Sequence, residues 1–204
     1  MKIDDQLNAV TRRVASSTAS HSVILEQTFT TTLGELWAAC TDPALLVRWF
    51  EPVEGELRQG GRYRLSDSST EGTITQCEPP TSLRITWEYE GDISEVVVKM
   101  RDSGGQVTLV LEHLMADSEH WRVFGPGAAG AGWDESFFAL ALFLAGDPQS
   151  TPEEMAQVNA TPEGKQFLLD TTAAWATAHI ASGADPRAAE EASQRTRTAY
   201  GAQT

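Results

Sequence analysis

From about Gly60 to His113, hydrophobic and polar residues alternate with a period of two, which is the pattern of strands with one covered face. An earlier segment, residues 23–31, alternates in the same way and predicts a first strand. Turn sequences interrupt the alternation, among them Glu78-Pro79-Pro80 and the tight hairpin sequence Ser103-Gly104-Gly105. Four or five strands joined by such short turns indicate an antiparallel meander.

Apolar residues at helical spacing predict short helices on both sides of the first strand. Residues 3–14 form the first of these, and a polar linker follows at 16–20. Two more short helices come directly after the strand. Thr32 caps one of them, and Asp42, with Pro43 at the first helical position, caps the other. The helical pair therefore separates the first strand from the meander.

The strongest helical signal runs from Trp133 to Leu144, after a Gly-rich segment at 125–132. Apolar residues occupy so much of its circumference that this helix must be largely buried. The concave face of the sheet is the surface that can bury it. The expected fold is therefore α+β, a helix-grip fold in which a curved antiparallel sheet wraps around one long helix.

The chain divides into three parts on this interpretation. They are an N-terminal helix and linker at 1–22, the helix-grip domain at 23–146 and a helical extension at 147–204. The extension holds helical patterns at 162–182 and at about 186–200 but few large apolar residues. We expect it to pack on the outside of the main domain or to form a contact between subunits, which makes a homodimer one expected assembly.

Composition narrows the class of protein. The 204 residues are 41% hydrophobic and 22% charged, as in ordinary globular domains. The net charge of −14 disfavours binding to nucleic acid and to anionic membranes. The acidic N-terminus does not resemble a signal peptide, and the longest apolar run, 137–145, is far shorter than the roughly 20 residues that span a bilayer. Two isolated cysteines, Cys40 and Cys77, agree with a cytoplasmic protein that has no membrane partner.

Several segments match a known superfamily in its order. They are Leu36–Pro43 with Trp49-Phe50, Gly60–Tyr63, Gly72–Ile74, Glu78–Pro80, Leu83–Trp87, Leu109–His113 and Gly132-Trp133. Over residues 23–145 the chain resembles the START-like (SRPBCC) superfamily, and within it the branch named after the activator of the heat-shock-protein-90 ATPase. The flanks at 125–127 and 174–186 are similar to a single-domain bacterial subgroup with a helical tail. The resemblance implies the helix-grip fold and a pocket, but it does not define an activity, because the eponymous co-chaperone resembles this chain only in its second domain.

A sheet curled around one helix often leaves an apolar cavity, the usual setting of a small-molecule site. Core packing is the alternative role for each large side chain that faces such a cavity. The candidate ligand-binding residues are Trp49, Tyr63, Trp87, Met100, Leu111, His113, Trp121, Phe124, Trp133 and Phe137. Trp121 and Phe124 belong to the segment 119–124, which is either a lid over the cavity or an ordinary surface loop.

His113 has the parity of Leu109 and Leu111, so it is expected to face the covered side of the sheet. It is either a hydrogen-bonding group or general acid–base at the cavity mouth, or a histidine bonded to the backbone. The other histidines are scattered without metal-ligand spacing, and no phosphate loop is present, so no metal and no cofactor are expected.

The leading functional hypothesis is therefore a non-catalytic carrier or sensor of a small apolar or aromatic molecule. One alternative is a cyclase- or dehydratase-like enzyme acting on a polyketide-like substrate, which would need His113 and a second acid or base. The other is a chaperone-associated module that binds proteins through the outer sheet face or the tail.

Overall fold

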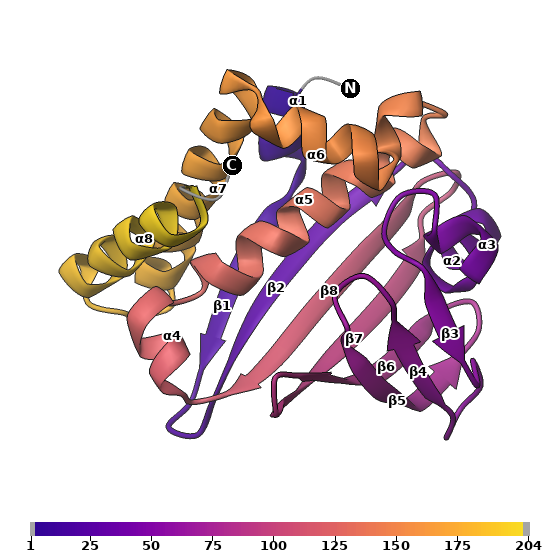
Figure 1. Ribbon diagram of the computed structural model, residues 1–204, viewed down its shortest axis with the longest axis horizontal. Coiled ribbons are helices and arrows are strands. Elements are labelled where there is room, and N and C mark those ends of the chain that lie inside the picture. Colours follow the sequence, from indigo (N-terminus) through magenta and orange to yellow (C-terminus); the bar gives the residue numbers. More distant parts are fainter. Residues whose placement is uncertain (1–2, 202–204) are drawn as a thin grey trace.

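The computed structural model describes residues 3–201 and contains one curved sheet with helices against it (Figure 1). All neighbouring strands are antiparallel, in the order β1-β2-β8-β7-β6-β5-β4-β3. The strands are β1 (Thr11–Ser16), β2 (Ser20–Phe29), β3 (Val53–Gly55), β4 (Arg62–Leu65), β5 (Glu71–Glu78), β6 (Ser82–Tyr89), β7 (Asp92–Asp102) and β8 (Val107–Ala116). The helices are α1 (Ile3–Ala9), α2 (Leu33–Thr41), α3 (Pro43–Leu46), α4 (Glu119–Phe124), α5 (Gly127–Leu144), α6 (Pro152–Ala160), α7 (Pro162–Ala181) and α8 (Pro186–Gly201).

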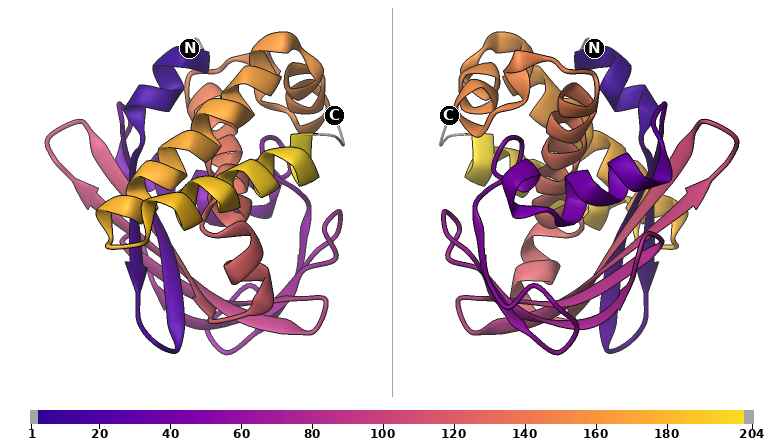
Figure 2. Two further views of the ribbon diagram at one scale, coloured as in Figure 1. Left: turned by 90° about the vertical axis from the view of Figure 1, so that its left-hand side faces the viewer. Right: turned by 90° about the vertical axis from the view of Figure 1, so that its right-hand side faces the viewer.

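The sheet curls around α5, which lies in its concave face (Figure 2). The period-two pattern explains this arrangement, because alternate residues of β8, from Val107 to His113, are buried while those between them are more exposed. Leu140 and Leu142 of α5 are 1% and 2% exposed in the core that this face covers. The α+β helix-grip architecture expected from the sequence is confirmed.

The start of the chain differs from the expectation. The helix predicted over 3–14 ends at Ala9, and residues 11–16 form β1, which pairs along its whole length with β2. The polar linker predicted at 16–20 is the turn of this hairpin, closed by the amide of Ser17 on the carbonyl of Ser20. The sequence misled because Val10 and Val14 fit both a helical spacing and an alternating one. Pairing with β2 satisfies the hydrogen-bonding groups of the backbone in this segment, and residues 11–16 therefore form a strand.

The helix caps were predicted correctly. Thr32 accepts from the amide of Glu35 at α2, and Asp42 accepts from the amide of Ala44 at α3. The second helix, α3, ends at Leu46, so Trp49 and Phe50 lie beyond it.

Most of the Gly-rich segment predicted to precede the long helix, residues 127–132, lies inside it, since α5 begins at Gly127. Glycine is needed here for close packing rather than for flexibility. A Cβ on Gly130 would lie 2.2 Å from the ring of Trp175 in α7. Sequence patterns alone do not reveal this approach of two helices.

The tail packs against the main body. Trp175 of α7 is fully buried and donates its indole N–H to Asp134 of α5 at 2.8 Å. Arg12 of β1 binds the same carboxylate at 2.7 Å, so one buried carboxylate joins the first strand, the central helix and the tail. The expectation that the tail packs on the main domain is therefore confirmed, while the division into three domains stays a prediction. Over residues 3–201, no helix has the length and apolar character needed to cross a membrane.

Candidate functional site

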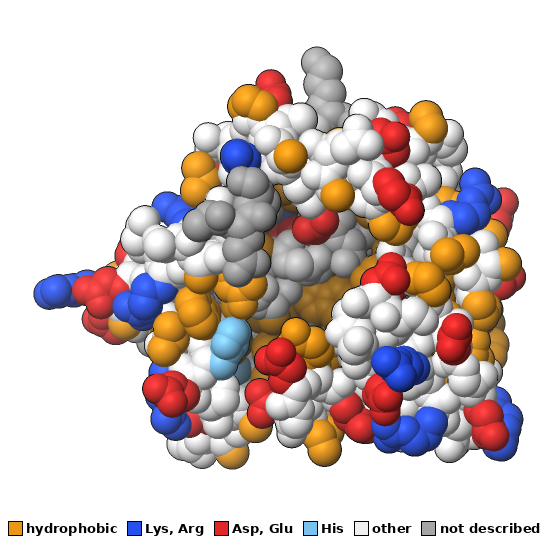
Figure 3. Space-filling view, in the orientation of Figure 1, with side chains coloured by type: hydrophobic (Ala, Val, Ile, Leu, Met, Phe, Trp, Pro, Cys, Tyr) orange, Lys and Arg blue, Asp and Glu red, His pale blue; other side chains and the backbone are white. Residues whose placement is uncertain are grey.

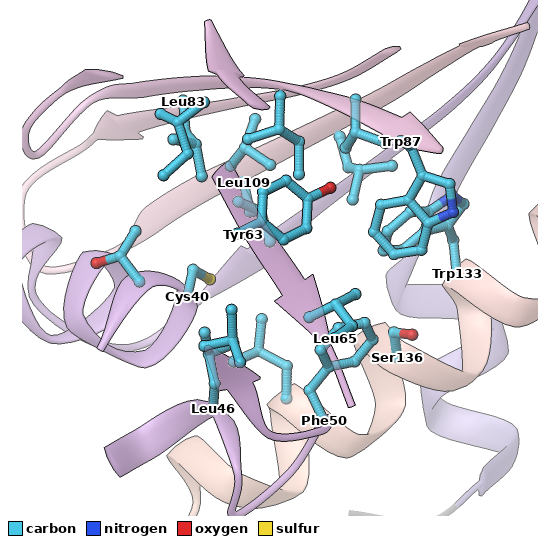
Figure 4. Close-up of a pocket in the computed structure, with 18 of the residues that line it drawn as sticks. Cys40, Leu46, Phe50, Tyr63, Leu65, Leu83, Trp87, Leu109, Trp133 and Ser136 are labelled. Atoms are coloured by element: carbon cyan, nitrogen blue, oxygen red, sulfur yellow. The ribbon is translucent and has the colours of Figure 1, made fainter. Parts of the chain in front are cut away.

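A cavity of about 180 Å³ lies between α5 and the concave face of the sheet. Strands β4 to β8 form one wall, α5 forms the second, and the segment from α2 to β3 closes the far end (Figure 4). Trp133, Ser136, Phe137 and Leu140, which are spaced three or four residues apart, line it from one side of α5. Tyr63, Trp87, Leu109 and Leu111 line it from the sheet.

The surface of the molecule is hollowed between the helical layer and the strands, and hydrophobic side chains form the floor of the hollow (Figure 3). Among the described residues that line the cavity, none is Asp, Glu, Lys, Arg or His. A charged group placed inside would lose its water without gaining a counter-charge. The lining therefore favours an uncharged occupant.

Three polar side chains of the lining are already bonded to backbone carbonyls. The Tyr63 hydroxyl donates to the carbonyl of Thr86 at 2.7 Å, the Trp49 indole donates to the carbonyl of Ala39 at 3.0 Å, and the Ser136 hydroxyl donates to the carbonyl of Gly132 at 3.0 Å. These bonds engage the polar ends of the three side chains with the protein itself. Figure 4 shows Tyr63 and Ser136 among the mostly apolar lining.

His113 lies behind the cavity wall and does not line it. It is 8% exposed, and both ring nitrogens are engaged: Trp133 Nε1 donates to Nδ1 at 3.0 Å, and Nε2 bonds Ser94 Oγ at 2.8 Å. Burial lowers the pKa of His113 to about 4, because the imidazolium would lose its hydration. A neutral imidazole whose two nitrogens are both hydrogen-bonded has no free nitrogen to act on a molecule in the cavity.

Cys40 and Cys77 both line the cavity, a position that the sequence analysis did not assign to them. Burial raises the pKa of the Cys40 thiol to about 12, so this thiol stays protonated and is a poor nucleophile. Cys40 lies one turn beyond Leu36 on the inward side of α2, and that spacing is the signal that could have placed it.

Six of the ten candidate residues line the cavity, and four do not. Those that line it are Trp49, Tyr63, Trp87, Leu111, Trp133 and Phe137. Those that lie elsewhere are Met100, His113, Trp121 and Phe124. Met100 is 3% exposed and is part of the packed core. The binding role of each residue stays a prediction, because geometry places side chains without showing a ligand.

The segment 119–124 forms α4 within the helical layer, away from the cavity. Trp121 stacks on His21 with ring centroids 4.3 Å apart, and Phe124 meets Tyr200 of α8 at 6.0 Å. Thr196 of α8 donates to the carbonyl of Phe124. These contacts attach α4 to β2 and to the tail, so the structure does not show it as a lid. No group of three or more metal-ligating side chains occurs in the part of the chain that the structure describes.

The family model for the Activator of Hsp90 ATPase homolog 1-like protein matches residues 30–145, more than half of the chain. The chain belongs to this family. The crystal structure of CalU16 from Micromonospora echinospora is 32% identical with a TM-score of 0.66, and the match covers 83% of this chain and 98% of that one. The solution structure of CalU16 gives a TM-score of 0.71 at 30% identity, over 86% and 97% of the two chains.

More distant solved structures share the architecture. DynU16, a protein in the dynemicin biosynthetic locus, is 22% identical with a TM-score of 0.56, over 64% of this chain and 49% of that one. PFC0360w of Plasmodium falciparum, an HSP90 activator, is 22% identical with a TM-score of 0.53, over 61% and 96%. At this identity the likeness shows the fold alone. No curated protein matched the chain.

Proposed function

We propose that this family member binds an uncharged apolar or aromatic molecule in the cavity beneath α5, as a carrier or sensor. The observation that carries the proposal is the lining, in which no described residue is charged and the polar ends of Tyr63, Trp49 and Ser136 are bonded to backbone carbonyls. Burial of apolar surface then supplies the binding free energy.

The aromatic side chains at one end of the cavity favour flat molecules. Trp87 and Trp133 meet edge to face, with centroids 5.4 Å apart and planes at 65°. A planar ligand that enters beside them meets a ring face from one indole and a ring edge from the other, and both contacts are favourable.

The alternatives have less support from the site. A cyclase- or dehydratase-like reaction needs an acid or base aimed at the substrate. No described lining residue is Asp, Glu, His, Lys or Arg, and burial raises the pKa values of the Cys40 thiol and the Tyr63 hydroxyl. A chaperone-associated role has PFC0360w as its relative, whose likeness at 22% identity supports the fold.

The proposal is tested by titrating the protein with N-phenyl-1-naphthylamine, an uncharged fluorescent probe. Val98 lines the cavity from β7, so Val98→Phe fills part of it. Val110 lies on the opposite face of β8, between the inward residues Leu109 and Leu111, so Val110→Phe is the matched control. We expect saturable binding of one probe to the wild type and to Val110→Phe, and at least about tenfold weaker binding to Val98→Phe. Equal binding by all three proteins would overturn the proposal, as would no binding by any.

A further inference from the structure

A chain of three hydrogen bonds connects the two indoles that line one end of the cavity. Trp133 Nε1 donates to His113 Nδ1 at 3.0 Å, His113 Nε2 meets Ser94 Oγ at 2.8 Å, and Ser94 Oγ donates to the backbone carbonyl of Trp87 at 3.1 Å. This series of hydrogen bonds therefore begins on α5, passes through β8 and β7, and ends on β6.

Only one arrangement of protons satisfies this chain. An indole N–H can only donate, so His113 Nδ1 must carry a lone pair. The proton of the neutral imidazole is then on Nε2, which donates to Ser94 Oγ. That hydroxyl is left free to donate to the carbonyl of Trp87, as its position requires. His113 is thus neutral with its proton on Nε2.

Protonation of His113 is incompatible with the bond to Trp133. A proton added at Nδ1 would point at the indole N–H, so a donor would face a donor and the bond would be lost. His113 lies behind the cavity wall and is 8% exposed. Its effect on a ligand therefore passes through the indole of Trp133, with the two ring centroids 5.9 Å apart.

No carboxylate within the described residues stabilises a charged His113. The flanking acids of the three adjacent strands point to the outer face: Glu112 accepts from Ser22, Glu95 pairs with Arg84, and Glu88 pairs with Arg62. On the remaining packed elements, Asp134 of α5 binds Arg12, Glu135 of α5 accepts from Asn159, and His21 of β2 meets Asp117. Burial accordingly lowers the pKa of His113 without an opposing charge.

We propose that His113 is a positioning residue for the cavity: as a neutral imidazole it fixes the indole of Trp133 as a wall, and its protonation releases that wall and weakens binding of an apolar molecule. The inference rests on the proposed function, because it concerns regulation of the same cavity. Proton and ligand then oppose each other, so affinity is constant at neutral pH and falls by up to about tenfold per pH unit once His113 titrates.

The test combines a spectrum with a pH profile. In the wild type at neutral pH, nitrogen-15 NMR is expected to show His113 Nδ1 unprotonated and Nε2 protonated. N-phenyl-1-naphthylamine is then titrated at successive pH values at which circular dichroism shows the folded protein. His113→Gln keeps an acceptor and a donor but does not titrate, so we expect near wild-type affinity without the loss in acid. His113→Leu leaves the indole N–H without an acceptor, and we expect about tenfold weaker binding at neutral pH.

The outcomes separate the two proposals. A proton on Nδ1 at neutral pH would overturn the positioning role, and so would a His113→Leu variant that binds like the wild type. The same holds if His113→Gln loses affinity in acid as the wild type does, because the surface carboxylates, which both proteins share, would then be the cause. Failure of every protein to bind the probe would instead contradict the proposed function, while the ring-nitrogen spectrum would still decide the tautomer.

Discussion

Trp133 and Asp134 are neighbours on α5, yet they face two regions built on opposite principles. Trp133 faces a cavity of about 180 Å³, where the described side chains present mostly carbon and leave space. Asp134 is fully buried on the other side, where it binds Arg12 and accepts from Trp175. On the tail side, buried polar groups hold α5 in place. The cavity side can therefore remain unfilled without loosening the fold.

The largest expected effect comes from breaking the buried ion pair. Asp134→Ala leaves the Arg12 guanidinium, whose side chain is 6% exposed, without its carboxylate. Removal of one partner of a buried pair costs about 3–5 kcal/mol. Unfolding in urea should show this loss. Asp134→Asn keeps an acceptor for the Trp175 indole and should lose less, whereas a loss below about 1 kcal/mol for Asp134→Ala would show that the pair does not anchor the tail.

The next effect is the pH dependence of stability that His113 causes. Its folded-state pKa of about 4 lies below the ordinary value of 6.5, so the unfolded chain binds the proton more tightly. The contribution of His113 to the free energy of unfolding is therefore fully present above pH 6.5. It falls by roughly 3 kcal/mol as the pH drops from 6.5 toward 4. Urea unfolding across this range should show a shallower fall for His113→Gln than for the wild type. Parallel curves would contradict the assignment.

Close packing on the tail side predicts a smaller loss. In Gly130→Ala the new Cβ meets the ring of Trp175, and such overpacking costs about 1–3 kcal/mol. Gly132 is the matched control on the same helix, because a Cβ there meets no atom within 4 Å. Gly132→Ala should therefore stabilise the protein by up to about 1 kcal/mol. If both substitutions shifted the thermal midpoint in the same direction, close contact with Trp175 would not be the reason for glycine at 130.

The smallest effect is expected at the cavity wall. Val98 is half-buried and borders empty space, whereas Val23 is fully buried in the packed core. Val98→Ala should cost about 1 kcal/mol or less, and Val23→Ala about 2 kcal/mol, because only the second creates a new void among packed neighbours. Equal losses in denaturant unfolding would indicate that the cavity wall is as tightly packed as the core.

The sequence predicted the features that depend on local pattern. Alternation placed His113 and Leu111 on the covered face, and apolar spacing identified α5 as the buried helix. The features it did not predict depend on distant partners. Arg12 has the same spacing as the inward residues Val10 and Val14. Its role in the structure depends on its ion pair with Asp134, 122 residues away. The bond that removes His113 from the lining likewise depends on Trp133, on a different element.

The central claim is that an apolar molecule occupies the space beneath α5, and intermolecular NMR contacts test it most directly. Nuclear Overhauser effects from bound N-phenyl-1-naphthylamine should reach Trp87, Leu111 and Phe137, which line the cavity from the sheet and from α5. Contacts confined to outward side chains such as Val110, at saturating probe, would contradict the account.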